Sequence, residues 1–341
     1  MKTMNAIGFR QHKPAHDPQA FERFTTARPV ASGRDLLVKV EAISVNPVDT
    51  KVRRSVQQVL DQPRIIGWDV AGIVDSAGSD ATLFKPGDAV YFAGDITRPG
   101  GNAEYVLVDE RIVGRKPATL DFAQAASLPL TTITAYEALF DRLGMNIQDT
   151  ERAATLLIIG GAGGVGSIAI QLAKLAGLKV IATASRTESM AWVKELGADH
   201  VIDHRKALRP QLEAVGLDHV DYLANFSSTD EYWEQITDVL RPEGRFVTIV
   251  ENSGPLPQER LKAKSLTHAW EMMFTRSMFK TAGMIRQHEL LNQVADWIDA
   301  GRIRHAMTTS LTPISVDNLR KAHAQLESGT SIGKLVLHGW A

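Results

Sequence analysis

The sequence predicts an α/β protein in which a β-barrel domain is joined to a doubly wound parallel sheet. Between Met1 and about Lys116, short apolar strands alternate with turn sequences such as KPGD and RPGG. From about Ser127 onward, strands alternate with amphipathic segments of helix length, which is typical of βαβ units. A glycine-rich segment, GGAGGVG at 160–166, lies between an apolar strand and an apolar-periodic helix.

Composition and charge limit the classes of function. The chain has 341 residues, and its 44% apolar and 23% charged residues are an ordinary balance for about two globular domains. A net charge of -1 gives no general attraction to nucleic acid or to an anionic membrane. There is no signal-peptide core, and no apolar run approaches the roughly 18 residues of a membrane span. We therefore expect a cytoplasmic protein without nucleic acid or membrane partners.

The expected elements follow the two patterns in order. The first region contains strands at 36–45, 69–78, 87–93 and 103–110. The second contains strands at 155–160, 179–184, 200–202, 220–225 and 245–250, with helices at 166–177, 187–198 and 229–244. Near the end, two helices at 288–301 and 315–329 precede a strand at 333–337. No internal repeat is seen, so two domains are the simplest interpretation.

The glycine-rich segment fits the pattern G-x-G-x-x-G with Gly161, Gly163 and Gly166. Gly161 would permit a tight turn, Gly163 would let the backbone approach a pyrophosphate, and Gly166 would let the helix pack closely on its strand. The helix N-terminus would face the anion. The segment therefore predicts a dinucleotide-binding site, and a glycine-rich turn without a ligand is the alternative.

The end of the second strand of this domain indicates which dinucleotide is bound. An NAD site usually has Asp or Glu there, about 20 residues after the glycines. This chain has Thr183, Ala184, Ser185 and Arg186, which include no carboxylate. Ser185 and Arg186 can bind a 2′-phosphate, so NADP(H) is favoured. The alternative is that Arg186 is a solvated residue before the next helix.

Seven segments spread over the chain carry a family resemblance. They are NPVDTKVR (46–53), IIGWDVAGIV (65–74), FKPGDAVY (84–91), GGNAEYVLVDE (100–110), AASLPLTTITAYEAL (125–139), GGAGGVG (160–166) and GKLVL (333–337). With these segments in this order, the chain resembles the medium-chain dehydrogenase/reductase superfamily. It is most similar to the zinc-independent quinone oxidoreductase branch, which includes zinc-type alcohol dehydrogenase-like proteins.

The resemblance implies a domain organisation. Residues 1–127 would form a GroES-like catalytic domain, and residues 128–276 a Rossmann domain that binds NADP(H). Residues 277–341 would return to the catalytic domain, and the nicotinamide would lie between the two domains.

A zinc ion is not expected. Alcohol dehydrogenases of this superfamily hold a catalytic zinc with Cys, His and Cys, at the positions that carry Asn46, Trp68 and Leu130 in this chain. The sequence has no cysteine, which also excludes a four-cysteine structural zinc. Because a catalytic zinc needs three protein ligands, we predict none.

Chemistry without a metal favours a conjugated substrate. A quinone or an α,β-unsaturated carbonyl spreads the developing negative charge, so a few hydrogen-bond donors suffice and water supplies the final proton. We nominate Asn46 and Lys51 as donors. Similar quinone reductases often have tyrosine at the position of Lys51, and the alternative for Lys51 is a solvent-facing residue.

Further residues complete the expected sites. Trp68, Tyr91 and Phe92 are interpreted as substrate-pocket wall or core, because aromatic side chains usually act through area and shape. The resemblance implies that Thr134 contacts the cofactor near its nicotinamide end. The other cofactor-binding residues we expect, besides the glycines of the motif, are Gly164, Val165, Asn225 and Lys334.

The leading hypothesis is an NADPH-dependent reductase of quinones or α,β-unsaturated carbonyl compounds. The alternatives are a non-catalytic NADPH-binding protein, structural or RNA-binding, and an alcohol dehydrogenase of the same superfamily. Residues 265–274 read as the last strand of the parallel sheet, with several bulky side chains. An exposed edge strand needs a cover, and in relatives the equivalent strand pairs across a two-fold axis, so we expect a homodimer.

Overall fold

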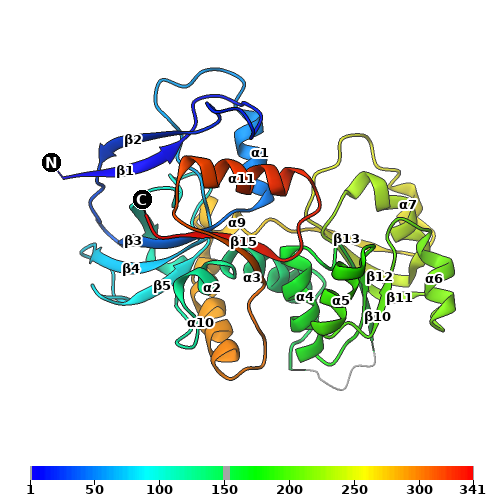
Figure 1. The fold of residues 1–341 in the computed structure, drawn as a ribbon. Helices are drawn as coiled ribbons and strands as arrows, with labels where there is room; N and C mark the ends of the chain where they lie inside the picture. Colours follow the sequence, from blue (N-terminus) through cyan, green and yellow to red (C-terminus); the bar gives the residue numbers. More distant parts are fainter. Residues whose placement is uncertain (1, 149–153, 341) are drawn as a thin grey trace. The chain divides into compact units, whose positions relative to one another are not determined.

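The computed structural model describes residues 2–148 and 154–340 (Figure 1). The chain forms two compact units. Unit 1 comprises Met1–Ile133 and Phe274–Ala341, and unit 2 comprises Thr134–Met273. The first change of unit falls inside helix α3 (Pro129–Tyr136), a few residues after the predicted boundary at 127, because this helix runs from one unit into the other.

Unit 1 is built on a seven-stranded sheet. Its order is β14 (Met307–Leu311), β15 (Lys334–His338), β3 (Asp35–Ser44), β4 (Val70–Ala77), β5 (Ala89–Phe92) and β7 (Val113–Arg115), with β6 (Tyr105–Asp109) pairing to β3. β1 (Thr3–Gly8) and β2 (Glu22–Ala27) precede these strands in the sequence and form a separate two-stranded antiparallel sheet. β15 pairs antiparallel with β3, so the C-terminal strand of the chain completes the N-terminal sheet. This is the GroES-like domain.

Helices and short turns surround this sheet. They are α1 (Pro47–Ser55), α2 (Phe122–Ala126), α9 (Thr275–Met278), α10 (Arg286–Asp299), α11 (Val316–Glu327) and the 3₁₀ turns η1 (Glu110–Ile112) and η3 (Ala282–Ile285). Helix α10 packs on β7, where the ring of His288 bonds the carbonyl of Val113 at 2.6 Å. The region up to about Lys116 therefore contains helical segments besides its strands, because α1 lies between β3 and β4 and η1 lies between β6 and β7.

Unit 2 is a six-stranded parallel sheet. Its order is β10 (His200–Ile202), β9 (Lys179–Thr183), β8 (Thr155–Ile159), β11 (Val220–Asn225), β12 (Leu240–Thr248) and β13 (Thr267–Trp270). The chain runs outward from β8 in one direction and then returns to build the other half from β11. This is the doubly wound order, in which ligands bind outside the carboxyl ends of the strands where the order reverses.

Helices connect the strands of unit 2. They are α4 (Gly164–Leu175), α5 (Thr187–Glu195), α6 (Leu208–Ala214), α7 (Thr229–Val239) and α8 (Glu259–Lys262), preceded by the π-helix η2 (Glu137–Arg142). α4 packs on β8 and β9, whereas α7 packs on β11 and β12. A core between α7 and the sheet contains the buried side chains of Leu157, Trp233 and Phe246. Right-handed crossovers place α4 and α7 on opposite faces.

The strand predicted at 265–274 is shorter than expected. β13 covers Thr267–Trp270 and lies at the edge of the sheet. Met273 and Phe274 leave the strand and are buried. None of the described helices has the length and apolar character needed to cross a membrane.

Candidate functional site

In unit 2, the glycine-rich segment forms the turn between β8 and α4. Gly163 is the N-cap of α4, and its N–H donates to the carbonyl of Gly160 at 3.1 Å. The N–H of Gly160 donates to the hydroxyl of Thr183 on β9 at 3.0 Å, which ties the turn to the next strand. No described side chain caps α4, so its first N–H groups face outward from a strand end.

The structural role of Gly161 differs from the predicted one. The positive φ, +81°, is at Gly160 and not at Gly161. A Cβ on Gly161 would lie 2.9 Å from the Cβ of Ala182, so this residue serves close packing on β9. A Cβ on Gly166 would lie 2.3 Å from the carbonyl oxygen of Gly160, which explains the glycine at the start of the helix. Among described atoms, a Cβ on Gly163 would meet that oxygen at 3.4 Å and nothing else, so this side is open to a ligand.

Ser185 and Arg186 follow β9 and are half-buried. A residue that the sequence analysis missed lies beside them. Arg205 Nη2 donates to the carbonyl of Ser185 at 2.8 Å and to the carboxylate of Asp203 at 2.9 Å. Hydrogen bonds from Arg205 lower the pKa of Asp203 to about 2. The pattern Asp-x-Arg directly after the strand HVI is the signal that could have indicated this second arginine.

The other predicted nucleotide-binding residues are spread over the chain. Gly164 and Val165 form the first turn of α4, and Thr134 lies in α3 with 5% of its surface exposed. Asn225 ends β11, where its amide donates to the carbonyl of Ser228 at 3.1 Å and accepts from the N–H of Ser227 at 3.0 Å. These residues belong to unit 2, whereas Lys334 belongs to unit 1.

Unit 1 contains a buried polar cluster around Asp69. Lys334, the first residue of β15, donates to the carboxylate of Asp69 at 3.1 Å, to the carbonyl of Val45 at 3.2 Å and to the side-chain oxygen of Asn46. The Asn46 amide donates to the same carboxylate at 2.9 Å. Lys334, Asp69 and Asn46 are 4%, 0% and 1% exposed, so their hydrogen bonds are shielded from water.

The cluster also fixes two helix ends. The other oxygen of Asp69 accepts from the N–H of Leu130 at 2.9 Å, in the first turn of α3. Asp49 accepts from the N–H of Asn46 at 2.7 Å and from the N–H of Gly67 at 3.0 Å. Burial raises the pKa of Asp49 to about 7 and also raises the pKa of Asp69, while the Lys334 ammonium opposes both shifts.

These contacts involve two residues that the sequence analysis placed in the binding sites. Asn46 was expected to donate a hydrogen bond to the substrate, but its amide is turned into the cluster and is buried. Lys334 was expected to bind the cofactor, but its ammonium has three protein acceptors. In this conformation the three N–H groups of Lys334 and the Asn46 amide bond to protein groups, so the binding of cofactor by Lys334 and of substrate by Asn46 stays a prediction.

The residues of this cluster do not fit a zinc ion. The chain segments around positions 46, 68 and 130 do meet, as the resemblance implies, and they meet at Asp69. Asparagine, tryptophan and leucine supply no thiolate or imidazole, however, and both oxygens of Asp69 already accept hydrogen bonds. Among the described residues, no group of three His, Cys, Asp or Glu side chains could hold a metal.

The three aromatic residues predicted to line the pocket lie in the core of unit 1. Trp68 packs edge-on against Phe274 with ring centroids 6.2 Å apart. The hydroxyl of Tyr91 donates to the carbonyl of Leu291 at 2.7 Å, and burial raises its pKa. Phe92 is 1% exposed. The sequence analysis interpreted these residues as substrate-pocket wall or core, and in this structure they pack in the core.

Lys51 differs from Asn46 in its exposure: Asn46 is the buried N-cap of α1, and Lys51 lies in the middle of this helix. Its side chain is exposed, on the same helix whose Asp49 and Arg53 are buried. The nomination of Lys51 as a donor to the substrate stays a prediction.

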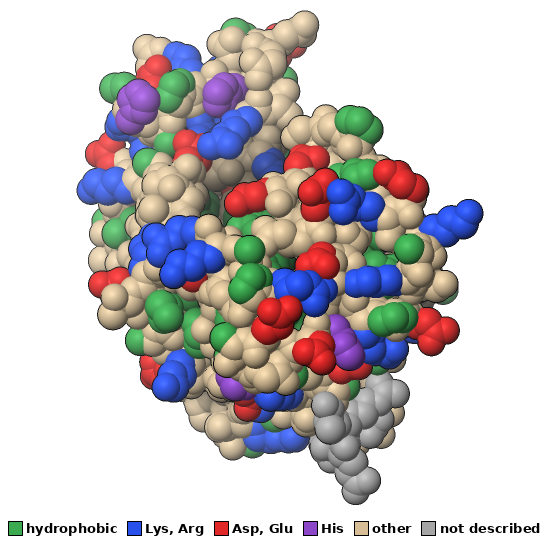
Figure 2. All heavy atoms as spheres, turned by 90° about the vertical axis from the view of Figure 1, so that its right-hand side faces the viewer, with side chains coloured by type: hydrophobic (Ala, Val, Ile, Leu, Met, Phe, Trp, Pro, Cys, Tyr) green, Lys and Arg blue, Asp and Glu red, His purple; other side chains and the backbone are tan. Residues whose placement is uncertain are grey.

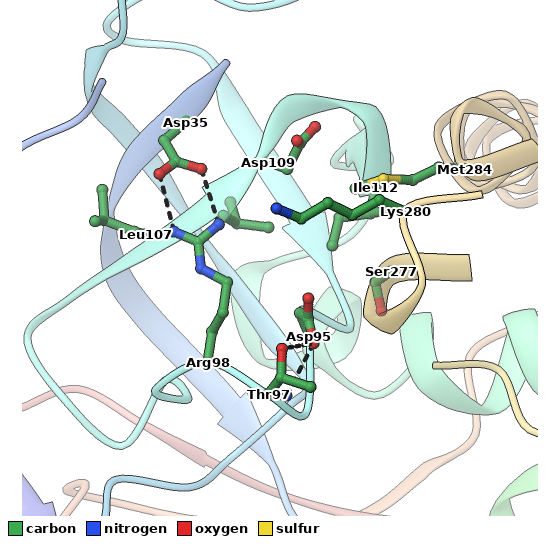
Figure 3. Close-up of a pocket in the computed structure, with 11 residues that line it drawn as sticks. Asp35, Asp95, Thr97, Arg98, Leu107, Asp109, Ile112, Ser277, Lys280 and Met284 are labelled. Atoms are coloured by element: carbon green, nitrogen blue, oxygen red, sulfur yellow. Dashed lines mark hydrogen bonds and ion pairs between the residues drawn. The ribbon is translucent and has the colours of Figure 1, made fainter. Parts of the chain in front are cut away.

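A separate cavity of about 340 Å³ lies within unit 1 (Figure 3). Arg98 and Asp35 face each other across one side of it, joined by two hydrogen bonds of 2.8 and 2.9 Å. Lys280 extends into it, and Leu107 and Met284 contribute apolar surface. None of the predicted substrate-pocket residues is among the described residues that line it.

Two family models match the chain. Residues 32–118 match the alcohol dehydrogenase GroES-like domain, and residues 196–337 match the zinc-binding dehydrogenase family. The first match covers strands β3 to β7, and the second covers the later part of the parallel sheet and the return to β15.

Two relatives are similar over most of the chain. A zinc-type alcohol dehydrogenase-like protein of Staphylococcus epidermidis is 41% identical over 336 residues, 98% of this chain and 99% of that protein. The 2-methylene-furan-3-one reductase of Solanum lycopersicum is 32% identical over 89% of this chain and 71% of that protein.

Solved structures of related proteins have the same fold as this chain. A Rhizobium etli protein assigned as a zinc-dependent alcohol dehydrogenase is 48% identical with a TM-score of 0.95, over 100% of this chain and 99% of that one. The quinone oxidoreductase of Coxiella burnetii is 29% identical with a TM-score of 0.81, over 99% of both chains. The chain therefore belongs to the medium-chain dehydrogenase/reductase superfamily of oxidoreductases.

Proposed function

We propose that this oxidoreductase transfers a hydride from NADPH to a quinone or an α,β-unsaturated carbonyl compound without zinc. The observation that carries the proposal is the cluster at Asp69, where the positions of the metal ligands hold Asn46, Trp68 and Leu130. Without a metal to polarise an isolated ketone, a conjugated acceptor is the chemically easier substrate. The similarity to a quinone oxidoreductase and to a plant reductase supports this class.

The choice of NADPH rests on charge at the end of β9. Ser185 and Arg186 follow the strand where an NAD site would have a carboxylate. Arg205 adds a second guanidinium beside the Ser185 carbonyl. Two arginines suit a 2′-phosphate better than a ribose hydroxyl, because guanidinium forks match phosphate oxygens.

The residues of the chain then have separate tasks. When bound, the nicotinamide supplies the hydride. The N-terminus of α4 holds the pyrophosphate, with Gly163 leaving room for its approach. We assign to Lys51 the hydrogen bond to the substrate oxygen, where negative charge develops, and water delivers the final proton.

A single assay tests the proposal. Oxidation of NADPH and of NADH is measured against quinones, cyclic enones, alkenals and simple ketones, with and without a strong chelator. We expect turnover with NADPH and a conjugated acceptor, little with simple ketones, and no loss on chelation. Zinc-dependent turnover of a simple alcohol or ketone would instead favour the alcohol dehydrogenase alternative.

A non-catalytic NADPH-binding protein is the other alternative, and the same assay separates it. Cofactor binding without turnover across the panel would favour it. A net charge of -1 disfavours an RNA-binding form, and on the face in Figure 2 Lys and Arg side chains are interspersed with Asp and Glu. A cytoplasmic location stays a prediction.

We also propose a homodimer through the edge of the unit 2 sheet. β13 pairs only with β12 among the described strands, and the nearby side chains of Trp270 and Met272 are 45% and 46% exposed. A second copy of β13 would cover this edge by a two-fold contact. Analytical ultracentrifugation at micromolar concentration checks it, and a stable monomer would remove the proposal.

A further inference from the structure

We propose that the buried ammonium of Lys334 is a built-in cation that takes the place of a metal in unit 1 and positions Asn46. This concerns the metal-free site alone and holds whichever acceptor is reduced. A failure of the substrate assay therefore leaves it standing.

The geometry shows a cation surrounded by oxygen. The Lys334 ammonium meets the carboxylate of Asp69 at 3.1 Å, the carbonyl of Val45 at 3.2 Å and the amide oxygen of Asn46. These acceptors come from the end of β3, the N-cap of α1 and the residue before β4. An ammonium with three oxygen acceptors around it fills the role that a small cation would have, without needing thiolates or imidazoles.

Charge explains why a cation is needed here. Asp69 is 0% exposed, and an ionised carboxylate without a partner in such surroundings is strongly disfavoured. It accepts one bond from the backbone of Leu130 and one from the Asn46 amide, and both donors are neutral. Lys334 supplies the full positive charge.

Lys334 also fixes the orientation of Asn46. The amide oxygen of Asn46 faces the ammonium, and its NH₂ group faces Asp69. A reversed amide would point its NH₂ group at the ammonium and its oxygen at a carboxylate. The ion pair therefore locks this side chain at the N-cap of α1, the helix that carries Lys51. Lys334 is a positioning residue and not a catalytic one.

One further ionisable group, Asp49, faces the ion pair of Lys334 and Asp69. Asp49 of α1 is the third buried ionisable group of the cluster, and both Lys334 and Asp69 influence its pKa. With Asp49 and Asp69 ionised, the cluster carries two negative charges and one positive charge. Loss of the ammonium therefore leaves both carboxylates without a counter-charge.

Unfolding of the full-length protein tests the inference in two backgrounds. Lys334→Met is made in the wild type and in Asp69→Asn, and unfolding temperatures are measured at pH 5 and pH 8. In the wild type we expect a loss on the order of 10 °C at pH 8, because one partner of a buried pair is left alone. The decrease in unfolding temperature should be smaller at pH 5, because the Asp69 carboxylate that has lost its ammonium partner then takes up a proton.

In the Asp69→Asn background, the same Lys334→Met change should cost clearly less, because the carboxylate that bonds Lys334 is gone and Asp49 alone remains as a buried carboxylate of the cluster. This comparison also works if the single Lys334→Met variant fails to fold. Lys174→Met is the matched control, since Lys174 forms a partly exposed pair with Asp199 at 2.8 Å and should shift the unfolding temperature slightly.

Two results would overturn the inference. An equal loss in both backgrounds, with no dependence on pH, would make Lys334 a packing residue only. Stoichiometric zinc in the purified wild type that disappears in Asp69→Asn would show that the cluster holds a metal after all.

Discussion

The N-termini of helices α4 and α1 differ in how their backbone N–H groups are capped. α4 begins at Gly163, and no side-chain cap hydrogen bond is made there by the described residues. α1 begins at Asn46, whose N–H donates to Asp49, so a carboxylate of the protein itself occupies the helix end. Each helix end carries a partial positive charge from unpaired N–H groups. One end is open to an external anion, and the other is filled.

The difference lies in what surrounds each turn. Glycines keep side chains away from α4, and Gly166 lets its first turn lie against Gly160. At α1, the buried cluster of Asn46, Asp69 and Lys334 fills the space. The open end suits a diphosphate, and the filled end supplies a rigid frame for exposed Lys51. The comparison shows that the same backbone feature, the N-terminus of a helix, is left open where glycines surround it and is occupied where a carboxylate of the protein caps it.

The largest expected effect separates two glycines of the open end. Gly166→Ala should lower NADPH affinity at least about a hundredfold and also destabilise the fold, because its Cβ would lie 2.3 Å from a backbone oxygen. Gly163→Ala should keep the wild-type unfolding temperature and lose NADPH affinity alone, since its Cβ would enter open space. Calorimetric titration and thermal unfolding measure both. Full NADPH affinity in Gly163→Ala would contradict a phosphate site at this turn.

The open end was predictable from sequence because its information is local. The glycines, the preceding strand and the following helix lie within about 20 residues. Even so, the left-handed residue is Gly160, one position before the expected Gly161. The pattern specifies that glycines are needed but does not specify which one takes the positive φ.

The filled end was not predictable, because its partners are far apart in the chain. Lys334 and Asn46 are separated by 288 residues, and Asn46 and Asp69 by 23. Sequence alone left Asn46 as a polar residue at a ligand position, so it was nominated to bind substrate. A lysine and an aspartate that each begin an apolar strand, GKLVL and DVAGIV, were the available hint of a buried ion pair.

The next prediction concerns how the filled end, through Asp49, makes the free energy of unfolding depend on pH. The folded pKa of Asp49, about 7, lies above its unfolded value near 4. The folded state therefore holds this proton more tightly, so the free energy of unfolding falls as pH rises between these values, by at most about 1.4 kcal/mol per pH unit. Asp49→Asn should remove this slope, as measured by chemical denaturation from pH 4 to 9.

Two controls sharpen this measurement. Burial and the neighbouring Glu137 raise the pKa of Glu271 in unit 2 to about 8, so Glu271→Gln should reduce the slope that remains in Asp49→Asn, to which the raised pKa of Asp69 also contributes. Asp203→Asn should act in the opposite direction, because the pKa of Asp203 is lowered and its contribution is lost only in acid. An unchanged slope in Asp49→Asn would show that this carboxylate is not strained by burial.

A smaller effect is expected from the exposed face of α1. If Lys51 donates to the substrate oxygen, Lys51→Met should lower kcat/KM about tenfold to a thousandfold and leave NADPH affinity intact. Lys13→Met is a control lysine elsewhere in unit 1, where the ammonium bonds Gln19. Steady-state kinetics with one quinone and one enone measure the change. Equal kinetics in Lys51→Met and the wild type would return Lys51 to the solvent-facing alternative.

The smallest effect concerns the proposed 2′-phosphate site of unit 2, at the start of α5. Arg186→Ala should weaken NADPH binding by about 1 to 3 kcal/mol, the value of a charge-assisted hydrogen bond, and leave NADH binding almost unchanged. Arg205→Ala should give a similar but smaller loss, because this guanidinium is already shared with Asp203 and the Ser185 carbonyl. Titration of each variant with both cofactors provides the comparison. Equal losses for NADPH and NADH would place these arginines away from the 2′-phosphate, and the open end of α4 would then be a dinucleotide site without preference between the two cofactors.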